Sequence, residues 1–138
     1  MIDVKFLRDN PDVVRASQKG RGEDVAIVDQ ALAADDLRRS AISEFETLRA
    51  EQNNLSKSVG AAKGEEKAAL LENAKSLAEK VKAADSKRAT LEVQASQLLM
   101  QLSNLLDPEA PLGGEADFVT IEHVGTPRDF TKDGFAAK

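Results

Sequence analysis

Basic side chains gather in the middle of the chain, and they are the residues with the clearest capacity for chemistry. Lysine and arginine bind phosphate groups, and the amides of Asn53 and Asn54 could add neutral donors toward phosphate or ribose. No aromatic residue lies between Phe45 and Phe118, so base stacking on this region is not expected. The basic set is Arg49, Lys57, Lys63, Lys67, Lys75, Lys80 and Lys82. A merely solvated helix face is the alternative interpretation of these charges.

No motif in the sequence supports catalysis by this chain alone. The sequence has no cysteine and a single histidine, His123, which excludes thiolate chemistry and argues against a zinc site. Gly113 and Gly114 lack the spacing of a phosphate-binding loop and are interpreted as a turn. No nucleophile motif or nucleotide fingerprint occurs. We therefore assign no catalytic, cofactor-binding or metal-binding residue, and whether the protein is an enzyme stays open at this stage.

The charge of the chain is unevenly distributed along it. The formal net charge of −5 argues at first sight against a nucleic-acid partner. Residues 49–88, however, carry nine Lys or Arg against six Asp or Glu, a net charge of +3, whereas residues 1–48 have −3 and residues 89–138 have −5. A basic segment between two acidic segments is a reasonable electrostatic footprint for binding a polyanion.

A heptad repeat predicts the element that carries much of this charge. Between Leu70 and Leu105, apolar residues recur at alternating steps of four and three, and only Arg88 interrupts them. Such strict spacing indicates a straight helix that packs along another helix. We expect the stem of Arg88 to pack and its guanidinium to reach solvent near Arg38 or Asp35. A specific role for Arg88 in setting the register of the two helices is the alternative.

The partner helix is predicted immediately upstream. Apolar residues recur at threes and fours from Ile27 to Val59, and Gly60 and Gly64 can end one helix and turn the chain. The predicted fold is all-α, a long antiparallel two-helix coiled-coil hairpin with the arm at about residues 24–106 and the turn at about 60–64. The hairpin would place the basic residues 49–88 at its far end.

Short helices are expected before the arm. Asp3 can cap a first helix that runs through Arg8, and Asn10 can cap a second that has Pro11 at its first position. Glycines at 20 and 22 would end this second helix, and Asp24 or Glu23 would begin the arm.

The C-terminal segment predicts a different kind of structure. Residues 107–114 are rich in proline and glycine, which a helix could not cross, and residues 118–124 alternate in the manner of a β-strand. A lone strand cannot bury its faces or pair its edges. We therefore divide the chain into residues 1–106, the N-terminal helices and the arm, and residues 107–138, a linker and the beginning of a further domain.

The order of these elements resembles the N-terminal region of bacterial seryl-tRNA synthetases, which are class II aminoacyl-tRNA synthetases. Motifs spread over nearly the whole chain carry the resemblance. They are FLRDNPDVV at residues 6–14, LRAEQNNLSK at 48–57, LSNLLDP at 102–108, PLG at 111–113 and GTPRDF at 125–130.

The resemblance implies a function. Family members use ATP and Mg²⁺ to activate serine and load it on tRNA(Ser), in a catalytic domain that follows the segment seen here. Their N-terminal arm reaches the long variable arm and the elbow of tRNA(Ser), in the homodimer from the other subunit. The resemblance thus implies a cytoplasmic tRNA-binding arm with no cofactor in this chain. No membrane is expected as a partner, because no apolar run in the sequence is long enough to span a bilayer. The residues expected to contact tRNA are Arg49, Asn53, Lys57, Lys63, Lys75 and Lys82.

Two rival functions are weighed beside this one. A structural or chaperone-like hairpin, such as a prefoldin-type protein-binding module, would need exposed apolar residues near the turn. The predicted turn instead holds Gly60, Ala61, Ala62, Lys63 and Gly64. A stand-alone accessory tRNA-binding protein is the other rival, and the unpaired strand expected at residues 118–124 argues against it.

Overall fold

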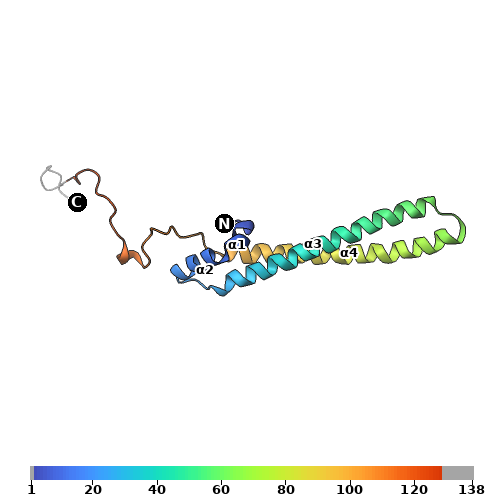
Figure 1. The fold of residues 1–138 in the computed structure, drawn as a ribbon, viewed down its shortest axis with the longest axis horizontal. Coiled ribbons are helices and arrows are strands. Elements are labelled where there is room, and N and C mark those ends of the chain that lie inside the picture. Colours follow the sequence, from blue (N-terminus) through green and yellow to red (C-terminus); the bar gives the residue numbers. More distant parts are fainter. Residues whose placement is uncertain (1, 129–138) are drawn as a thin grey trace, which may run out of the picture. The chain divides into compact units, whose positions relative to one another are not determined.

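A computed structural model describes residues 2–128 of the chain, which form two units that divide after Asp107. The first unit is helical. Its long helices α3 (Ala26–Ala61) and α4 (Gly64–Gln101) lie antiparallel and side by side, joined by a tight turn (Figure 1). The predicted all-α fold with a long helical hairpin is therefore confirmed.

The heptad repeat of α4 forms the seam of the hairpin. Val81, Ala84 and Ala95 are buried against α3, and the other repeat positions between Leu70 and Leu98 are half-buried. Leu102 is also buried, whereas Leu105 is 38% exposed because the helix has already ended. The apolar stripe is narrow, as expected for two helices that pack mainly on each other.

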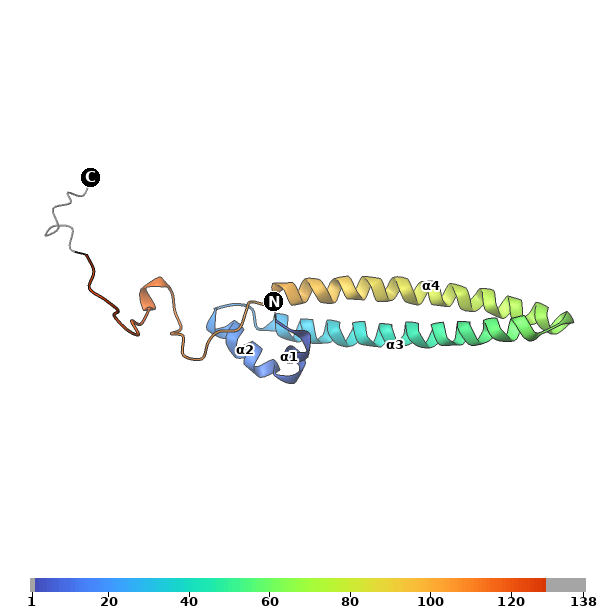
Figure 2. The ribbon, with the colours of Figure 1, turned by 90° about the horizontal axis from the view of Figure 1, so that it is seen from above.

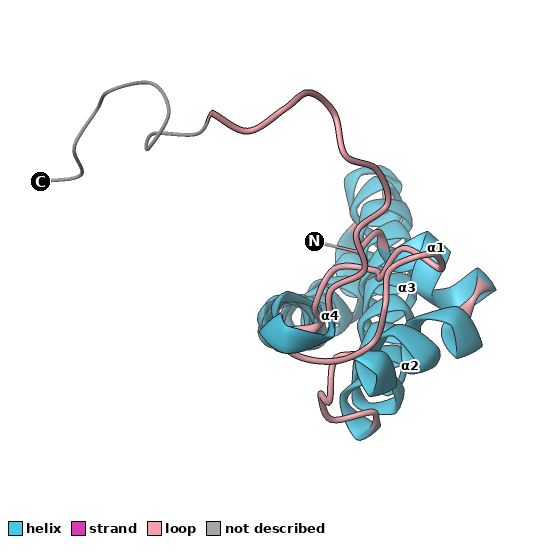
Figure 3. Cartoon of the chain, turned by 90° about the vertical axis from the view of Figure 1, so that its left-hand side faces the viewer, coloured by secondary structure: helices cyan, strands magenta, loops and turns pink. Residues whose placement is uncertain are grey.

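Two short helices cover the base of the hairpin, at the end opposite the turn (Figure 2). These are α1 (Val4–Asp9) and α2 (Pro11–Gly20), which place Leu7 and Val14 in a small core with Val28 and Leu102. Figure 3, an end view, shows both lying beside the base of α3. The base is thus a compact cluster of packed helices, from which the hairpin extends as a stiff projection.

The structure confirms the predicted side-chain cap of α1 but not that of α2. Asp3 caps α1 as expected, because its Oδ1 accepts hydrogen bonds from the amides of Lys5 and Phe6 at 2.7 and 3.0 Å. Pro11 occupies the start of α2. Asn10 occupies the N-cap position of α2, but its side chain does not make the expected capping hydrogen bond. The side-chain amide of Asn10 instead donates to the carbonyl of Phe6 at 3.3 Å, at the end of α1.

The arm begins and ends a few residues inside its predicted bounds, whereas the turn lies within the predicted residues 60–64. The helix α3 begins at Ala26, whose amide donates to Asp24 Oδ1 at 2.9 Å. The helix α4 ends at Gln101 rather than Leu106, because the next residues leave the helix and bond to α2 instead. Ser103 N donates to Gln18 Oε1 at 3.2 Å, and Leu106 N donates to Ser17 Oγ at 2.8 Å.

One charged side chain is fully buried in the base. Asp35 on α3 accepts hydrogen bonds from Arg8 Nη1 of α1 and from Arg38 Nη2 of α3, both at 2.7 Å. Burial alone would raise the pKa of Asp35, but the hydrogen bonds from Arg38 and Arg8 outweigh it and lower the pKa below the ordinary value of 3.8. The carboxylate is therefore ionised and ties α1 to the hairpin.

The second unit, from Pro108, has little regular structure among its described residues. It holds one 3₁₀ turn, Glu115–Asp117, in which Asp117 Oδ2 accepts a hydrogen bond from Gly114 N at 2.8 Å. The strand expected at residues 118–124 is not formed, and Ile121 is 98% exposed. An isolated strand has no partner for its backbone groups, which explains the difference. Asp129 and Phe130, part of the last family motif, lie outside the described residues.

Candidate nucleic-acid interface

The heptad register of the far part of the hairpin assigns each side chain to a side. In α3, core position a falls on Phe45, Gln52 and Val59, and position d on Leu48 and Leu55. In α4, position a falls on Ala74, Val81 and Arg88, and position d on Leu70, Leu77 and Ala84. All of these residues are buried or half-buried, and nearly all others between residues 43 and 90 are exposed. The register therefore holds in the structure.

The hairpin has two distinct flat faces. In an antiparallel pair, positions g of the two helices meet on one face and positions e on the other. Glu44 and Lys87, both at g, form a 2.8 Å ion pair across the helices and mark the g face, which also includes positions c. A shallow groove lined by Glu44, Leu48, Lys80, Ala83, Ala84 and Lys87 contains only g, c and d positions.

The opposite face, named here the e face, includes positions e and b. At the base of the hairpin, a groove on this face is lined by Val4 of α1 and by residues of the arm at positions a, b and e. These arm residues are Arg38, Glu92, Ala95, Ser96 and Leu99. Helix α1 therefore lies on the e face at the base. The same line of e positions in α3 begins with the buried Val28 and Asp35 and becomes exposed at Arg49.

All six residues predicted to contact RNA are exposed, and four of them share one face. Arg49, Asn53, Lys75 and Lys82 occupy e or b positions, so the structure brings α3 and α4 residues together on the e face. Lys57, at position f, lies on the outer edge of α3, and Lys63 lies in the turn. Lys80, only two residues from Lys82, lies on the g face. Assignment of heptad positions from the sequence alone could have placed these two lysines on opposite faces.

Few of these side chains are engaged within the chain. Arg49 Nη1 donates to Gln52 Oε1 at 3.1 Å, and Lys75 lies 3.8 Å from a carboxylate oxygen of the exposed Glu72. Among the described residues, Lys57, Lys63 and Lys82 have no carboxylate within ion-pair distance. Cations held this loosely in water are available to a polyanion at little cost in lost interactions.

Arg88 differs from its predicted surroundings. Its stem lies in the seam and its guanidinium reaches the surface as expected, but its neighbours are not Arg38 and Asp35. The guanidinium lies 5.1 Å from the centroid of the Phe45 ring and bonds Asp85 at 2.7 Å and Glu92 at 3.1 Å. The hydrogen bond with Asp85 raises the pKa of Arg88 above its usual value. Asp35 is bonded instead by Arg8 and Arg38. Sequence spacing gave no means to anticipate the pairing with Arg8, which lies on a different helix.

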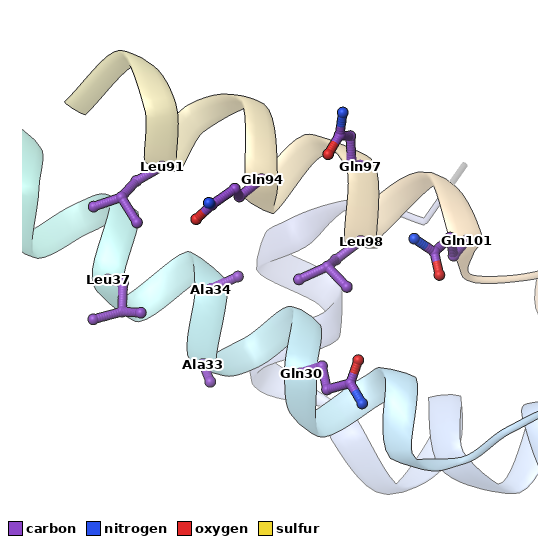
Figure 4. A pocket seen from close by; sticks show the side chains of 9 residues that line it. All are labelled: Gln30, Ala33, Ala34, Leu37, Leu91, Gln94, Gln97, Leu98 and Gln101. Carbon is purple, nitrogen blue, oxygen red and sulfur yellow. The ribbon is translucent and has the colours of Figure 1, made fainter. Parts of the chain in front are cut away.

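An apolar groove lies on the g face near the base (Figure 4). Leu91 and Leu98 of α4 point toward α3, where Ala34 and the 57% exposed Leu37 complete the floor. The remaining lining residues are Ala33 and four glutamines, Gln30, Gln94, Gln97 and Gln101. The groove has no charged residue, and its lining residues lie nearer the base than the six predicted contact residues, so it is not part of the candidate interface.

Other kinds of site find little support in residues 2–128. No three His, Cys, Asp or Glu side chains in this range are grouped so that they could hold a metal ion. No helix in it is long and apolar enough to cross a membrane. Near the turn, Leu71 is exposed by 45%, whereas Val59 and Leu70 are half-buried in the seam. One exposed leucine gives an apolar client little to bind, which disfavours a chaperone-like tip.

Comparison with protein families gives a match over most of the helical unit. The model of the "Seryl-tRNA synthetase N-terminal domain" family matches residues 1–106. A serine–tRNA ligase of Streptomyces coelicolor is 53% identical over 135 residues, which are 98% of this chain and 32% of that protein. One of Mycolicibacterium smegmatis is 53% identical over 128 residues, 93% of this chain and 31% of that protein. The chain thus spans about a third of the length of these relatives.

A solved structure has the same fold. The cytoplasmic serine–tRNA ligase of Naegleria fowleri, solved in complex with AMP, superposes with a TM-score of 0.73 at 23% sequence identity. The match covers 93% of this chain and 29% of that one. At this level of identity the comparison supports the architecture of the helical unit.

Proposed function

The chain belongs to the family of seryl-tRNA synthetase N-terminal domains, and from this premise we propose that its hairpin is a tRNA-binding arm. The arm positions the long variable arm and the elbow of tRNA(Ser) for ATP-dependent serylation. A catalytic domain outside this chain performs that reaction and supplies the sites for ATP, Mg²⁺ and serine. The observation that carries the proposal is a stiff two-helix projection whose far residues, 49–88, have a net charge of +3.

The proposed mechanism is positioning by charge and shape. Exposed Lys and Arg side chains on the far part of the arm neutralise phosphates and release the counterions bound to the RNA. Because residues 46–117 hold no aromatic side chain, the arm selects its RNA by backbone geometry rather than by stacking on bases. The proposed contact residues are Arg49, Asn53, Lys57, Lys63, Lys75 and Lys82.

The proposal extends to residues 107–138, which we assign to the linker and the beginning of the catalytic domain. The apolar side chains of residues 118–124 are exposed here, with Phe118 at 75% and Val124 at 87%. In the full-length protein, residues 118–124 would form a strand of the catalytic domain's sheet, which would cover these side chains. The full-length protein would act as a cytoplasmic homodimer, in which the arm of one subunit serves tRNA bound to the other.

The proposal is tested by binding this chain to tRNA(Ser) and to a tRNA with a short variable loop over a series of salt concentrations. We expect preferential binding of tRNA(Ser), with an affinity that falls steeply as salt rises. Equal affinity for the two tRNAs would mean that the arm binds RNA only as a generally basic surface, without selecting the long variable arm. Absence of binding at low salt by both the chain and the full-length protein would contradict the proposal, and so would equal binding by the full-length protein with and without its arm.

A further inference from the structure

We propose that an uncharged patch on the base half of the hairpin is a docking surface for the part of the catalytic domain that follows residue 138. The uncharged patch comprises the exposed residues of α4 between 89 and 101 together with Gln30, Ala33 and Leu37 of α3. The inference rests on the proposed function only in that a catalytic domain follows the arm. It adds the surface that fixes the direction in which the arm leaves that domain.

The two halves of α4 differ in charge. Residues 64–88 contain eleven charged side chains, whereas residues 89–101 contain one, Glu92. Glu92 is half-buried and accepts two hydrogen bonds from Arg88 Nη1, both at 3.1 Å, so its charge is already paired. Every exposed residue of α4 from 89 to 101 is therefore uncharged. A helix that stays in water normally carries charged residues on its outer side, and depletion of charge is typical of the centre of a protein interface.

Three large apolar side chains are exposed in the uncharged patch. Val93 and Met100, at position f on the outer edge of α4, are 56% and 64% exposed, and Leu37 across the apolar groove is 57% exposed. Three glutamines of α4 line this groove, and Gln97 points away from α3 (Figure 4). Their neutral amides can form hydrogen bonds with a partner without the desolvation cost of a charge. Such a surface is suited to contact with another folded domain.

The size of the uncharged patch fits a tethered domain better than a free partner. Residues 89–101 of a helix are about 20 Å long, and one helix face with its adjoining groove is roughly 15 Å wide, which gives an area of about 300 Å². Stable complexes of separate proteins usually bury about 800 Å² on each partner, so a second copy of this chain would find too little area here. Interfaces between domains of one chain can be as small as about 600 Å² in total.

The chain leaves the hairpin at the same end as the uncharged patch. The helix α4 ends at Gln101, and the amides of Ser103 and Leu106 then donate hydrogen bonds to side chains of α2. The segment that leads toward the catalytic domain therefore starts from the base of the hairpin and not from its turn. A domain joined through a short linker has a local concentration in the millimolar range, which makes a small interface sufficient.

Hydroxyl-radical footprinting tests the inference, because it reports the exposure of individual side chains. Modification rates are measured by mass spectrometry in this chain and in the full-length protein. We expect Val93, Met100 and Leu37 to be modified at least about fivefold more slowly in the full-length protein. The matched controls are Val13 on α2 and Leu71 near the turn, which are 51% and 45% exposed outside the patch. Unchanged rates in the patch, or equal slowing of patch and control residues, would overturn the inference.

A charge placed in the uncharged patch provides a second test. Val93→Glu replaces an exposed side chain by a better helix former, so the arm should fold normally. In the full-length protein it should return the modification rate of Met100 to within about twofold of the rate in this chain, because docking would bury the new charge. Leu71→Glu, outside the patch, should leave the slowing at Met100 intact.

Two results of these experiments would contradict the assignment of the catalytic domain as the occupant. Slow modification of Met100 that persists in full-length Val93→Glu would mean that the patch does not carry the contact. Slowing of Met100 in this chain at high protein concentration would mean that a second copy covers the patch. Binding of tRNA(Ser) by the chain tests the proposed function separately, and neither result would change it.

Discussion

Arg8 Nη1 donates a 2.7 Å hydrogen bond to Asp35 Oδ2, and this pair joins the first short helix to the first helix of the arm. The Asp35 side chain is 1% exposed, whereas the Arg8 side chain is 29% exposed. A carboxylate buried to this extent is stable only with its partners in place, because its desolvation must be offset by charged hydrogen bonds. The contact therefore ties the position of α1 to the ionised state of one residue.

Replacement of this carboxylate should destabilise the base of the arm. Asp35→Ala leaves two arginines without their shared partner and a gap beneath α1, and we expect it to lower the free energy of unfolding by about 2–4 kcal/mol. Asp36→Ala is the matched control, since the adjacent Asp36 is exposed and lies 3.6 Å from Arg39. It should change stability by less than about 0.5 kcal/mol. Urea unfolding followed by circular dichroism measures both, and equal effects would contradict the role of Asp35.

The same residue should contribute to the pH dependence of stability. Its pKa in the folded protein is lowered by Arg38 and Arg8 despite the opposing effect of burial. The unfolded chain therefore takes up the proton first as pH falls, and the stability that Asp35 contributes is present above its ordinary value of 3.8 and lost below it. The difference in unfolding free energy between the native chain and Asp35→Asn should be constant near neutral pH and narrow below about pH 4. A difference that stays constant down to pH 3 would contradict this assignment.

Much of the arm could be predicted from sequence because heptad spacing is a direct signature of helix pairing. The repeat from Leu70 placed the seam, and Gly60 and Gly64 placed the turn. The base could not be predicted in the same way. It depends on contacts between distant residues, such as Ser103 with Gln18 and Arg8 with Asp35, that no local pattern encodes. The end of α4 was mispredicted for this reason, since the apolar spacing continues to Leu105 while the backbone leaves the helix to reach α2.

The candidate interface was predicted as a set of residue types, and the structure adds how they are arranged. The sequence places cations far from the base, and Lys82 but not Lys80 is among the predicted contact residues, although neither lysine is assigned to a face. Their separation onto two faces follows from the register, which is confirmed by the Glu44–Lys87 pair and by the lining of the two grooves. The surroundings of Arg88 could not be predicted from spacing, because its neighbour Phe45 is opposite it only in the folded hairpin.

Two glycines near the turn should respond in opposite ways to replacement by alanine. Gly60 lies inside α3 with nothing within 4 Å of an added Cβ, so Gly60→Ala should stabilise the chain by about 0.5–1 kcal/mol. Gly64 has φ of +63°, a conformation that strains other residues, so Gly64→Ala should destabilise by about 1–2 kcal/mol. Thermal unfolding of the two variants measures the contrast. Stabilisation by both would mean that the turn does not need the left-handed conformation at Gly64.

The last prediction concerns the chain that leaves the arm, which is held by side chains of α2. Gln18 is 1% exposed, and its Oε1 accepts the hydrogen bond from Ser103 N at 3.2 Å. Gln18→Met keeps the bulk of the side chain but removes the acceptor, so the Ser103 amide loses its partner at a cost of about 1–2 kcal/mol. We expect faster hydrogen exchange at Ser103, by roughly five- to thirtyfold, as this segment opens locally.

The neighbouring Ser17 provides a control that acts on a different amide. Its Oγ accepts from Leu106 N at 2.8 Å, so Ser17→Ala should accelerate exchange mainly at Leu106 and Gln18→Met mainly at Ser103. Arg21 Nε also donates to Asn104 O at 3.0 Å, and this contact should hold the segment near α2 in either variant. Site-specific changes would mean that each α2 side chain holds its own residue of the exit segment. Uniform acceleration at both amides would instead mean that the segment opens as one unit, and unchanged exchange would show that these hydrogen bonds do not hold it.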